Sequence, residues 1–508
     1  MSSSQHDERA MTAPATAPSD ARTIPSAPAG SILARTEPLR DAPSPLAIFE
    51  SAEARGERRF YAAHPRRGLE IVAVGRVAEI RADTPSDRAT LRARVEALVS
   101  RIVPVAPSGG PAHPEGARAD DPPRAERDAE GPAPGPLLVG GIAFDAAPAA
   151  GRAAHWAQFG AASFVLPELL VVRTPRGTWL TRTAAIDRAE IRGAPPARNG
   201  HDAAVLDALA RIDRAAAWLE KAPAARTRPR GELHCAAADP DDPRRTRYLA
   251  AVDRVIAAIR RGEAYKVVLA SEEVFEGASI ARTVGVLADF AGHQPESLTY
   301  AQGIGDTTFL GASFERLAYV RGVDVRTAAI AGTIAKSDLT DREAGHPLSR
   351  STKDRDEQAI VAEQIQRALD PIAEAVAMDA VPQILSAGAF HHLHTRIRAR
   401  LARPVHLLDV VDRLHPTPAL GGHPCIEALA LIRAHEPFDR GWYGGPIGWV
   451  GPSGDGEMYV ALRCALAEPG VIRMFAGSGV MADSVPEREA RETSQKLGAI
   501  RRVVEGHL

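Results

Sequence analysis

Hydrophobic and polar positions alternate with two different periods along this chain, and together they predict a fold that mixes strands with helices. A helix is predicted over residues 246–260, with Gly262 as its stop, because one face carries Tyr248, Val252, Val255, Ile256 and Ile259. Residues 89–102 show the same helical period. Short runs rich in Val and Ile, bounded by Gly or Pro, predict strands at 60–63, 69–75, 137–144, 169–173 and 266–270.

Two segments lack either period. Residues 1–43 are rich in Ala, Pro, Ser and Thr, and residues 104–136 are rich in Pro, Gly, Arg and acidic side chains. Such compositions bury too little apolar surface to become ordered, so we predict a disordered leader at 1–43 and a disordered surface loop at 104–136. No repeat of about 20–50 residues is visible. Residues 44–508 are therefore predicted to form one domain.

Composition excludes several classes of protein. The 508 residues include 62 basic and 64 acidic side chains, a net charge of −2, so nothing favours binding to nucleic acid or to an acidic membrane surface. The N-terminus has no signal-peptide pattern, and no run of about 18 apolar residues predicts a membrane span. The three cysteines (Cys235, Cys425 and Cys464) are far apart and lack metal-binding spacing. We therefore expect a cytoplasmic protein with buried, reduced thiols.

Lys266 is the first candidate for chemistry, because it lies in the apolar strand segment Lys-Val-Val-Leu-Ala. A lysine on a strand usually extends to solvent from a sheet edge. If the side chain is buried instead, loss of water lowers its pKa from about 10.4 and makes it a candidate general base. The strand pattern alone leaves both alternatives open.

Carboxylates also stand on the apolar stripes of two predicted helices. Glu357 begins one stripe, and Glu492 lies on the other, three residues after Glu489 and four before Lys496. The stripes continue through Val361, Ile365 and Leu369, and through Ala499, Ile500 and Val503. A buried carboxylate is unfavourable unless it is paired or bound to a metal, and carboxylates from two helices suit a hard cation such as Mg²⁺. The alternatives are a charge that complements the helix dipole and an ordinary helical salt bridge.

Gly477-Ser-Gly479, together with Arg463, is a candidate anion site. Exposed backbone N–H groups and a guanidinium fork are suited to hold a carboxylate. A tight turn explains the same glycines equally well. The chain has no Walker loop, Gly-x-Ser-x-Gly elbow or dinucleotide-binding fingerprint.

In their order along the chain, these segments resemble the chorismate-utilising enzymes and, within them, the isochorismate synthases. The matching blocks are residues 140–145, 265–270, 311–317, 331–333, 392–395, 414–422, 436–448, 477–480 and 489–496. The likeness runs from about residue 44 to the C-terminus. It implies an α/β (α+β) fold, in which one large chorismate-binding domain has two packed antiparallel sheets and outer helices.

The resemblance also implies a reaction and a role for each matching residue. Lys266 is expected to activate the water that attacks C2 of chorismate, and Glu315 to protonate the departing C4 hydroxyl. Glu357 and Glu492, with Glu489 acting through water, are expected to hold Mg²⁺ over the ring carboxylate. The other matches are expected to bind substrate: Thr333, His392, Ala419, Tyr443, Arg463, Gly477, Gly479 and Lys496.

Two positions and one loop decide between subfamilies. Aminodeoxychorismate synthases carry a nucleophilic lysine where this chain has Ala331, and anthranilate synthases generally carry glutamine in place of Lys266. Residues 415–420 have the isochorismate-synthase form. The resemblance therefore implies a chorismate isomerase without a glutaminase subunit, and we expect a monomer. Four positions depart from the family pattern without removing a catalytic group: Phe314, Gln358, Ser478 and Val485.

Two alternatives remain open. A salicylate synthase makes isochorismate and then eliminates pyruvate in the same pocket, and only residues 415–420 argue against it. A catalytically silent binding or regulatory homologue would have lost Lys266, Glu315 or a metal carboxylate, and all of these are present. No residue decides whether the product enters menaquinone or siderophore synthesis.

Overall fold

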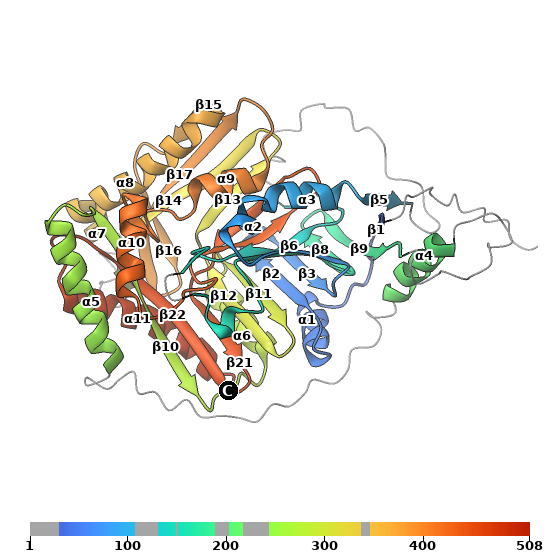
Figure 1. The fold of residues 1–508 in the computed structure, drawn as a ribbon, viewed down its shortest axis with the longest axis horizontal. Helices are drawn as coiled ribbons and strands as arrows, with labels where there is room; N and C mark the ends of the chain where they lie inside the picture. Colours follow the sequence, from blue (N-terminus) through green and yellow to red (C-terminus); the bar gives the residue numbers. More distant parts are fainter. Residues whose placement is uncertain (1–29, 107–130, 149–150, 188–202, 217–242, 337–345) are drawn as a thin grey trace, which may run out of the picture.

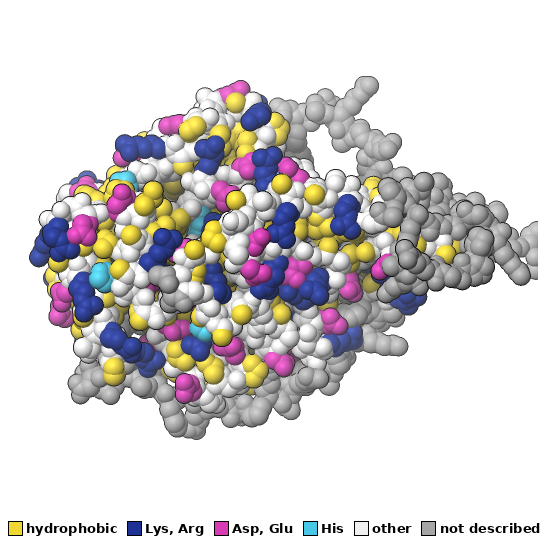
Figure 2. Space-filling model, in the orientation of Figure 1, with side chains coloured by type: hydrophobic (Ala, Val, Ile, Leu, Met, Phe, Trp, Pro, Cys, Tyr) yellow, Lys and Arg dark blue, Asp and Glu magenta, His cyan; other side chains and the backbone are white. Residues whose placement is uncertain are grey.

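The computed structural model describes residues 30–106, 131–148, 151–187, 203–216, 243–336 and 346–508. Within these residues two large sheets pack against each other, and helices cover their outer sides (Figure 1). Basic and acidic side chains are interspersed over the face in Figure 2, as expected from the near-zero net charge.

The first sheet has 12 strands, and every neighbouring pair is antiparallel except β1–β5. Its strands, in spatial order, are β18 (Gly422–His423), β10 (Lys266–Glu276), β22 (Val471–Val480), β21 (Cys464–Glu468), β12 (Thr307–Ser313), β11 (Leu298–Ile304), β2 (Arg59–His64), β3 (Leu69–Val74), β8 (Leu169–Thr174), β9 (Gly177–Ala185), β1 (Ile32–Pro38) and β5 (Ile102–Val105).

The second sheet has 10 strands and is antiparallel throughout. Its strands, in spatial order, are β15 (Ala373–Met378), β17 (Phe390–Leu401), β14 (Asp324–Ala335), β13 (Arg316–Arg321), β20 (Gly456–Val460), β19 (Pro446–Val450), β6 (Leu138–Ile142), β7 (Ala162–Leu166) and β4 (Ala78–Ala82), with β16 (Gln383–Ala387) beside β17.

The largest hydrophobic core lies between the sheets and includes buried side chains from both, such as Phe60 and Ile447. Trp156 packs edge-to-face on Phe159 and Phe309 in this core, a favourable geometry for aromatic rings. A second core lies on the other side of the 12-stranded sheet. Its helices are α1 (Pro45–Ala54), α6 (Thr283–His293) and α11 (Pro486–Glu505).

The other helices pack on the sheets one by one. Those near the site are α5 (Pro243–Arg260) and α10 (Cys425–His435) against β10, and α8 (Thr352–Leu369) against β14 and β17. The rest are α2 (Pro85–Ala89), α3 (Leu91–Val99), α4 (Ala203–Ala216), α7 (His346–Arg350) and α9 (Leu407–Leu414). Ser351 caps α8 by accepting the N–H of Asp354, at 3.2 Å, which satisfies one of the unpaired donors of its first turn.

The predicted fold class is confirmed, as are most of the predicted elements. The predicted helix over 246–260 is α5, which begins three residues earlier, and its five predicted apolar residues are all buried. The predicted strands correspond to β2, β3, β6, β8 and β10. The prediction of a helix over 89–102 is partly wrong, because that segment contains α3 and then enters β5 at Ile102.

The predicted disordered leader is wrong for residues 32–38, which form β1 and pair with β9 along their whole length. Ile32, Leu33 and Ala34 are buried there, so this short apolar run gains enough contact to be ordered despite its polar neighbours. The predicted disordered loop is wrong for Pro104 and Val105, which belong to β5, and for residues 131–136, which the structure also describes. Residues 1–29 and 107–130 lie outside the described residues.

Two smaller expectations have mixed outcomes. Cys464 is free and buried as expected, whereas Cys425 is exposed and Cys235 lies outside the described residues. No helix in the described part of the chain is long and apolar enough to cross a membrane.

Candidate active site

One pocket gathers the predicted site residues from distant parts of the chain. It is formed by β10, β14, β17 and β22 together with α8 and α11. Its lining includes Glu315, Thr333, Glu357, His392, Ala419, Tyr443, Arg463, Gly477, Gly479, Glu489, Glu492 and Lys496. Lys266 lies behind this wall and reaches it through Glu357. The structure therefore brings all the predicted site residues together, and their individual roles remain predictions.

Lys266 is buried at the first position of β10, with 1% of its side chain exposed. Its Nζ donates to Glu357 Oε1 at 2.5 Å, so the alternative of an exposed lysine at a sheet edge is excluded. Burial alone would raise the pKa of Glu357, but the ammonium of Lys266 outweighs this and holds it below its usual value. The same contact occupies Lys266 Nζ, the atom that would accept a proton.

Glu315 occupies the short connection where the chain crosses from β12 in one sheet to β13 in the other. Its backbone is held at this crossing, since its N–H donates to Ser313 Oγ and its carbonyl accepts the N–H of Val460. Burial raises the pKa of the Glu315 carboxyl to about 7, against the opposing effects of the Thr417 hydroxyl at 3.4 Å and of more distant charges. A carboxyl with this pKa is partly protonated near neutral pH, as a general acid requires.

Arg463 stands at another crossing between the sheets, from β20 to β21. Its backbone is left-handed, with φ of 46°, a conformation that costs energy for a residue other than glycine and that occurs most often at functional sites. The guanidinium lies over the rings of Phe314 and Phe390, at 5.5 and 5.2 Å from their centroids. Both rings therefore fix a buried cation at the wall of the pocket.

His392 presents an unused polar atom to this pocket. Its Nδ1 lies 3.1 Å from Thr333 Oγ1, and its ring stacks on Phe314 at 4.5 Å between centroids. Its Nε2 is buried and has no hydrogen-bond partner among the described residues. Burial, followed by the charges of Arg463 and Lys496, holds the pKa of His392 well below its usual value, so the ring is neutral. A buried, unpaired nitrogen is costly, which suggests that a ligand completes this bond.

Gly477 and Gly479 belong to strand β22, so the alternative of a tight turn is wrong. A Cβ on Gly479 would lie 2.9 Å from Lys266 Cε and 3.2 Å from Glu357 Oε1. A Cβ on Gly477 would lie 2.4 Å from the carbonyl oxygen of Leu269. The glycines therefore leave room for the Lys266–Glu357 pair and for close pairing of β22 with β10.

The backbone of these glycines also faces the pocket side of β22. The Gly477 carbonyl accepts Lys496 Nζ at 2.9 Å, while Ala270, opposite it on β10, donates its N–H to Glu436. In antiparallel pairs such residues direct N–H and C=O away from each other's strand, and the pattern repeats every second residue. The N–H groups of Gly477 and Gly479 therefore point away from β10. On that side β21 does not pair with them, because its pairing with β22 reaches only to Phe475.

Each predicted metal carboxylate is paired with a lysine. Besides the Lys266–Glu357 pair, Lys496 donates to Glu492 at 2.6 Å, and Lys353 Nζ lies 3.7 Å from Glu489. The Lys496–Glu492 contact has the i, i+4 spacing of an ordinary helical salt bridge, which was one of the sequence alternatives. Three ammonium groups thus compensate three carboxylates at one corner of the pocket.

The chemistry of that corner suits a hard divalent cation. Asp354, which sequence reasoning missed, lines it beside Glu357, Glu489 and Glu492. Burial and then the charge of Glu492 raise the pKa of Glu489, and burial together with Glu357 raises that of Asp354. Oxygen ligands with excess negative charge are those that Mg²⁺ prefers. Among the described residues, no three such side chains already form a compact ligand set.

Sequence reasoning also missed three supporting residues. Thr417 bonds to Glu315, and Lys353 and Asp354 precede Glu357 in the first turn of α8. Asp354 and Glu357 are three residues apart and share a helix face, so this spacing was a usable signal. Nothing in the sequence connects Thr417 with Glu315, because the two are 102 positions apart.

The departures from the family pattern have structural explanations in three cases. Phe314 supplies the ring between His392 and Arg463. Gln358 is buried and donates to Ala329 O and Thr395 Oγ1. Ser478 bonds to Tyr248. Nothing in the structure explains Val485.

Comparisons with known proteins show the family to which the chain belongs. The family model described as chorismate binding enzyme matches residues 123–505. The salicylate biosynthesis isochorismate synthase of Pseudomonas aeruginosa is 37% identical over 380 residues, 73% of this chain and 75% of that protein. Isochorismate synthase MenF of Bacillus subtilis is 33% identical over 367 residues, 72% of this chain and 73% of that protein.

A solved structure shows the same fold. It is that of MenF, the menaquinone-specific isochorismate synthase from Escherichia coli, with a TM-score of 0.70 and 22% identity over 95% of this chain and 96% of that one. The protein therefore belongs to the family of chorismate-binding enzymes. Within that family it is an enzyme of the isochorismate synthase group.

Proposed function

We propose that this protein is a Mg²⁺-dependent isochorismate synthase, which adds water at C2 of chorismate and releases the C4 hydroxyl. The observation that carries this proposal is the placement of a buried carboxyl and a buried lysine around one pocket. Glu315 has a pKa raised to about 7, and Lys266 is buried in an ion pair with Glu357. An allylic displacement needs a proton donor on one side of the ring and a proton acceptor on the other.

Glu315 is the proposed general acid. Its protonated form donates to the C4 hydroxyl as the C–O bond breaks, so the hydroxyl leaves as water. Thr417 holds the carboxyl in place, and the fixed backbone at the sheet crossing orients it. The positioned acid supports an enhancement on the order of 10²–10⁴-fold.

Lys266 is the proposed general base, which takes a proton from the water that attacks C2. Its Nζ already donates to Glu357 Oε1, and this contact occupies the atom that would take the proton. Glu357 is also a proposed metal ligand, so one carboxylate serves either the lysine or a cation. Lys266 is free to accept the proton when Glu357 binds the cation instead.

The anionic groups of chorismate have matching partners. Arg463, Tyr443 and the N–H groups of Gly477 and Gly479 are proposed to bind the enolpyruvyl carboxylate. His392 Nε2 offers a neutral partner, and Thr333 holds its ring. Ala419 and Lys496 complete the lining.

Glu357 and Glu492 are the proposed Mg²⁺ ligands, with Glu489 in support. A bound Mg²⁺ supplies charge that anchors the ring carboxylate and stabilises the transition state. Without Mg²⁺, Lys266, Lys353 and Lys496 balance the charges of these three carboxylates.

The test is product chromatography after the full chain is incubated with chorismate, with Mg²⁺ and with a chelator. Isochorismate alone, formed only with Mg²⁺, is the expected result. The Lys266→Ala variant is the control for contaminating activity. Salicylate with pyruvate would show that the pocket also performs the elimination, and no product would indicate a silent homologue.

A further inference from the structure

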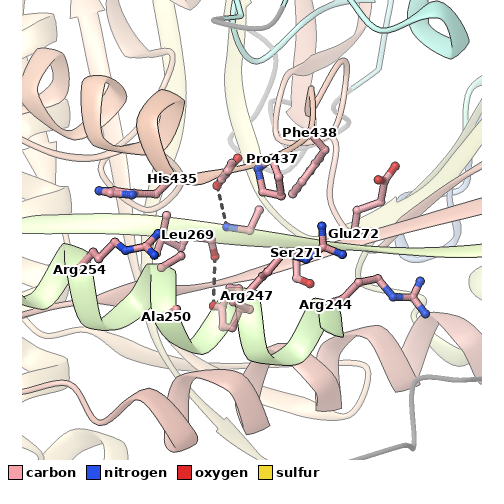
Figure 3. A pocket seen from close by; sticks show the side chains of 14 residues that line it. Arg244, Arg247, Ala250, Arg254, Leu269, Ser271, Glu272, His435, Pro437 and Phe438 are labelled. Atoms are coloured by element: carbon pink, nitrogen blue, oxygen red, sulfur yellow. Dashed lines mark hydrogen bonds between the residues drawn. The ribbon is translucent and has the colours of Figure 1, made fainter. Parts of the chain in front are cut away.

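A second pocket lies farther along strand β10, at residues 269–272, whereas Val268 of the same strand lines the active pocket. Figure 3 shows it between α5 and residues 435–438, with β10 between them. We call it the α5 pocket; it shares no lining residue with the active pocket. None of the catalytic or metal-binding candidates belongs to it.

The α5 pocket has an excess of positive charge. Arg244, Arg247 and Arg254 are spaced by three and seven residues, so they lie on one face of α5. Its two carboxylates are already engaged, since Glu272 pairs with Arg473 and Glu436 pairs with Arg440. Within the described residues, no carboxylate pairs with Arg247 or Arg254.

Apart from Ser271 and His435, the rest of the lining is mainly apolar. Leu269, Ala250 and Ala251 contribute aliphatic surface, and Tyr248 and Phe438 contribute aromatic surface. Arginines beside rings and aliphatic side chains suit a ligand that is partly flat and apolar and partly anionic, because the guanidinium forks bind the carboxylate and the rings pack on its apolar part.

Tyr248 connects this pocket with the active site. Its buried hydroxyl lies 2.9 Å from Ser478 Oγ on β22 and 3.0 Å from Thr493 Oγ1 on α11. The Ser478 hydroxyl is among the groups that lower the pKa of Glu489, and Thr493 follows Glu492 directly in the sequence. Tyr248 therefore holds the helix that carries both carboxylates against the strand of the active pocket.

A second connection runs through the ion pair of Glu436 and Arg440. Glu436 accepts the N–H of Ala270 on β10, and Arg440 donates to the carbonyls of Val268 and Leu420. Val268 and Leu420 line the active pocket. Both pockets thus share the backbone of β10 as a common wall.

We propose that the α5 pocket binds a small ring-bearing carboxylate, and that its occupancy is transmitted through Tyr248 to Glu489 and Glu492. The effect on Glu489 and Glu492 rests on the proposed function, because it treats them as Mg²⁺ ligands. The binding of a carboxylate in the α5 pocket does not depend on the proposed function.

Binding is tested with benzoate by calorimetry on the full chain, with inorganic sulfate as the comparison. Arg247→Gln/Arg254→Gln should weaken benzoate binding at least about tenfold, because two charged hydrogen-bond partners are lost. Arg245→Gln is the matched control, since Arg245 is exposed on the same helix and does not line the pocket. Arg463→Gln, which disables the anion partner in the active pocket, should retain the binding.

Three results overturn the binding proposal. They are no benzoate binding to the unaltered chain, equal binding by Arg247→Gln/Arg254→Gln, and loss of binding in Arg463→Gln alone. Sulfate that binds as tightly as benzoate would overturn the requirement for a ring.

Transmission is tested by the affinity for Mg²⁺, measured by calorimetry with and without benzoate. We expect benzoate to change the dissociation constant for Mg²⁺ about threefold or more. Saturating Mg²⁺ should change the dissociation constant for benzoate by the same factor, because coupling between two sites is reciprocal. Tyr248→Phe should remove the coupling while retaining benzoate binding, and Ser478→Ala provides the same test if that variant does not fold. Coupling that persists in both overturns the assigned route. Absence of isochorismate with benzoate binding intact would refute the proposed function alone.

Discussion

The active pocket has two corners that shift the pKa of a carboxyl group in opposite directions. At the sheet crossing, Glu315 has a hydroxyl as its hydrogen-bond partner, and burial raises its pKa to about 7. At the helix corner, Glu357 is also in the pocket wall, but an ammonium at 2.5 Å holds its pKa below the usual value. Burial is common to both, so the partner decides which carboxyl keeps its proton. The comparison explains how one pocket contains both an acid and an anionic corner.

The largest expected effect is that of Lys266→Ala, which removes the cation from the second corner. Turnover should be abolished while chorismate binding survives. The variant should also lose about 3 kcal/mol of stability, because the partly buried carboxylate of Glu357 is left without its partner. Single-turnover kinetics and denaturant unfolding measure the two effects. Normal turnover would rule out the general-base role.

Glu315→Gln abolishes the acid while keeping its shape. We expect turnover to fall on the order of 10²-fold or more, with little change in chorismate affinity. In the unaltered enzyme the protonated carboxyl is active, so activity should fall as pH rises through about 7. This limb should vanish from the pH–rate profile of Glu315→Gln, and an unchanged limb would mean that another group causes it.

Glu492→Gln and Glu357→Gln should weaken the Mg²⁺ dependence and the activity together. We expect the half-saturating Mg²⁺ concentration to rise about tenfold or more, since one charged oxygen ligand is lost. Glu363→Gln is the control, because Glu363 is exposed on α8 and pairs with Arg367. An unchanged Mg²⁺ titration would refute the metal assignment.

The smallest effect is expected from Thr417→Val, which removes the hydroxyl that hydrogen-bonds to Glu315. The Thr417 hydroxyl lowers the pKa of Glu315, so its removal should move the alkaline limb to higher pH. The shift should be less than about one pH unit, since the bond is long at 3.4 Å. A shift to lower pH in the pH–rate profile would contradict this account.

Local sequence patterns predicted some features well. The stripe through Val361, Ile365 and Leu369 placed Glu357 on the buried face of α8, because helical spacing alone determines which residues share a face. Ile32, Leu33 and Ala34 were missed, since three apolar residues in a polar context predict order only when a sheet is available to receive them. Gly477 and Gly479 were ambiguous for a similar reason, because their neighbours on β10 are about 200 residues away.

The sequence by itself determined which residues are available for chemistry, the faces of the helices and strands that carry them, and the family to which their order points. Only the tertiary structure decided that Lys266 is buried and paired with Glu357, and that Glu315 keeps a pKa of about 7. It alone revealed the α5 pocket, which β10 and α5 help to line. The reason is physical: burial and charge partners depend on contacts between segments far apart in the chain, whereas periodicity depends only on neighbours.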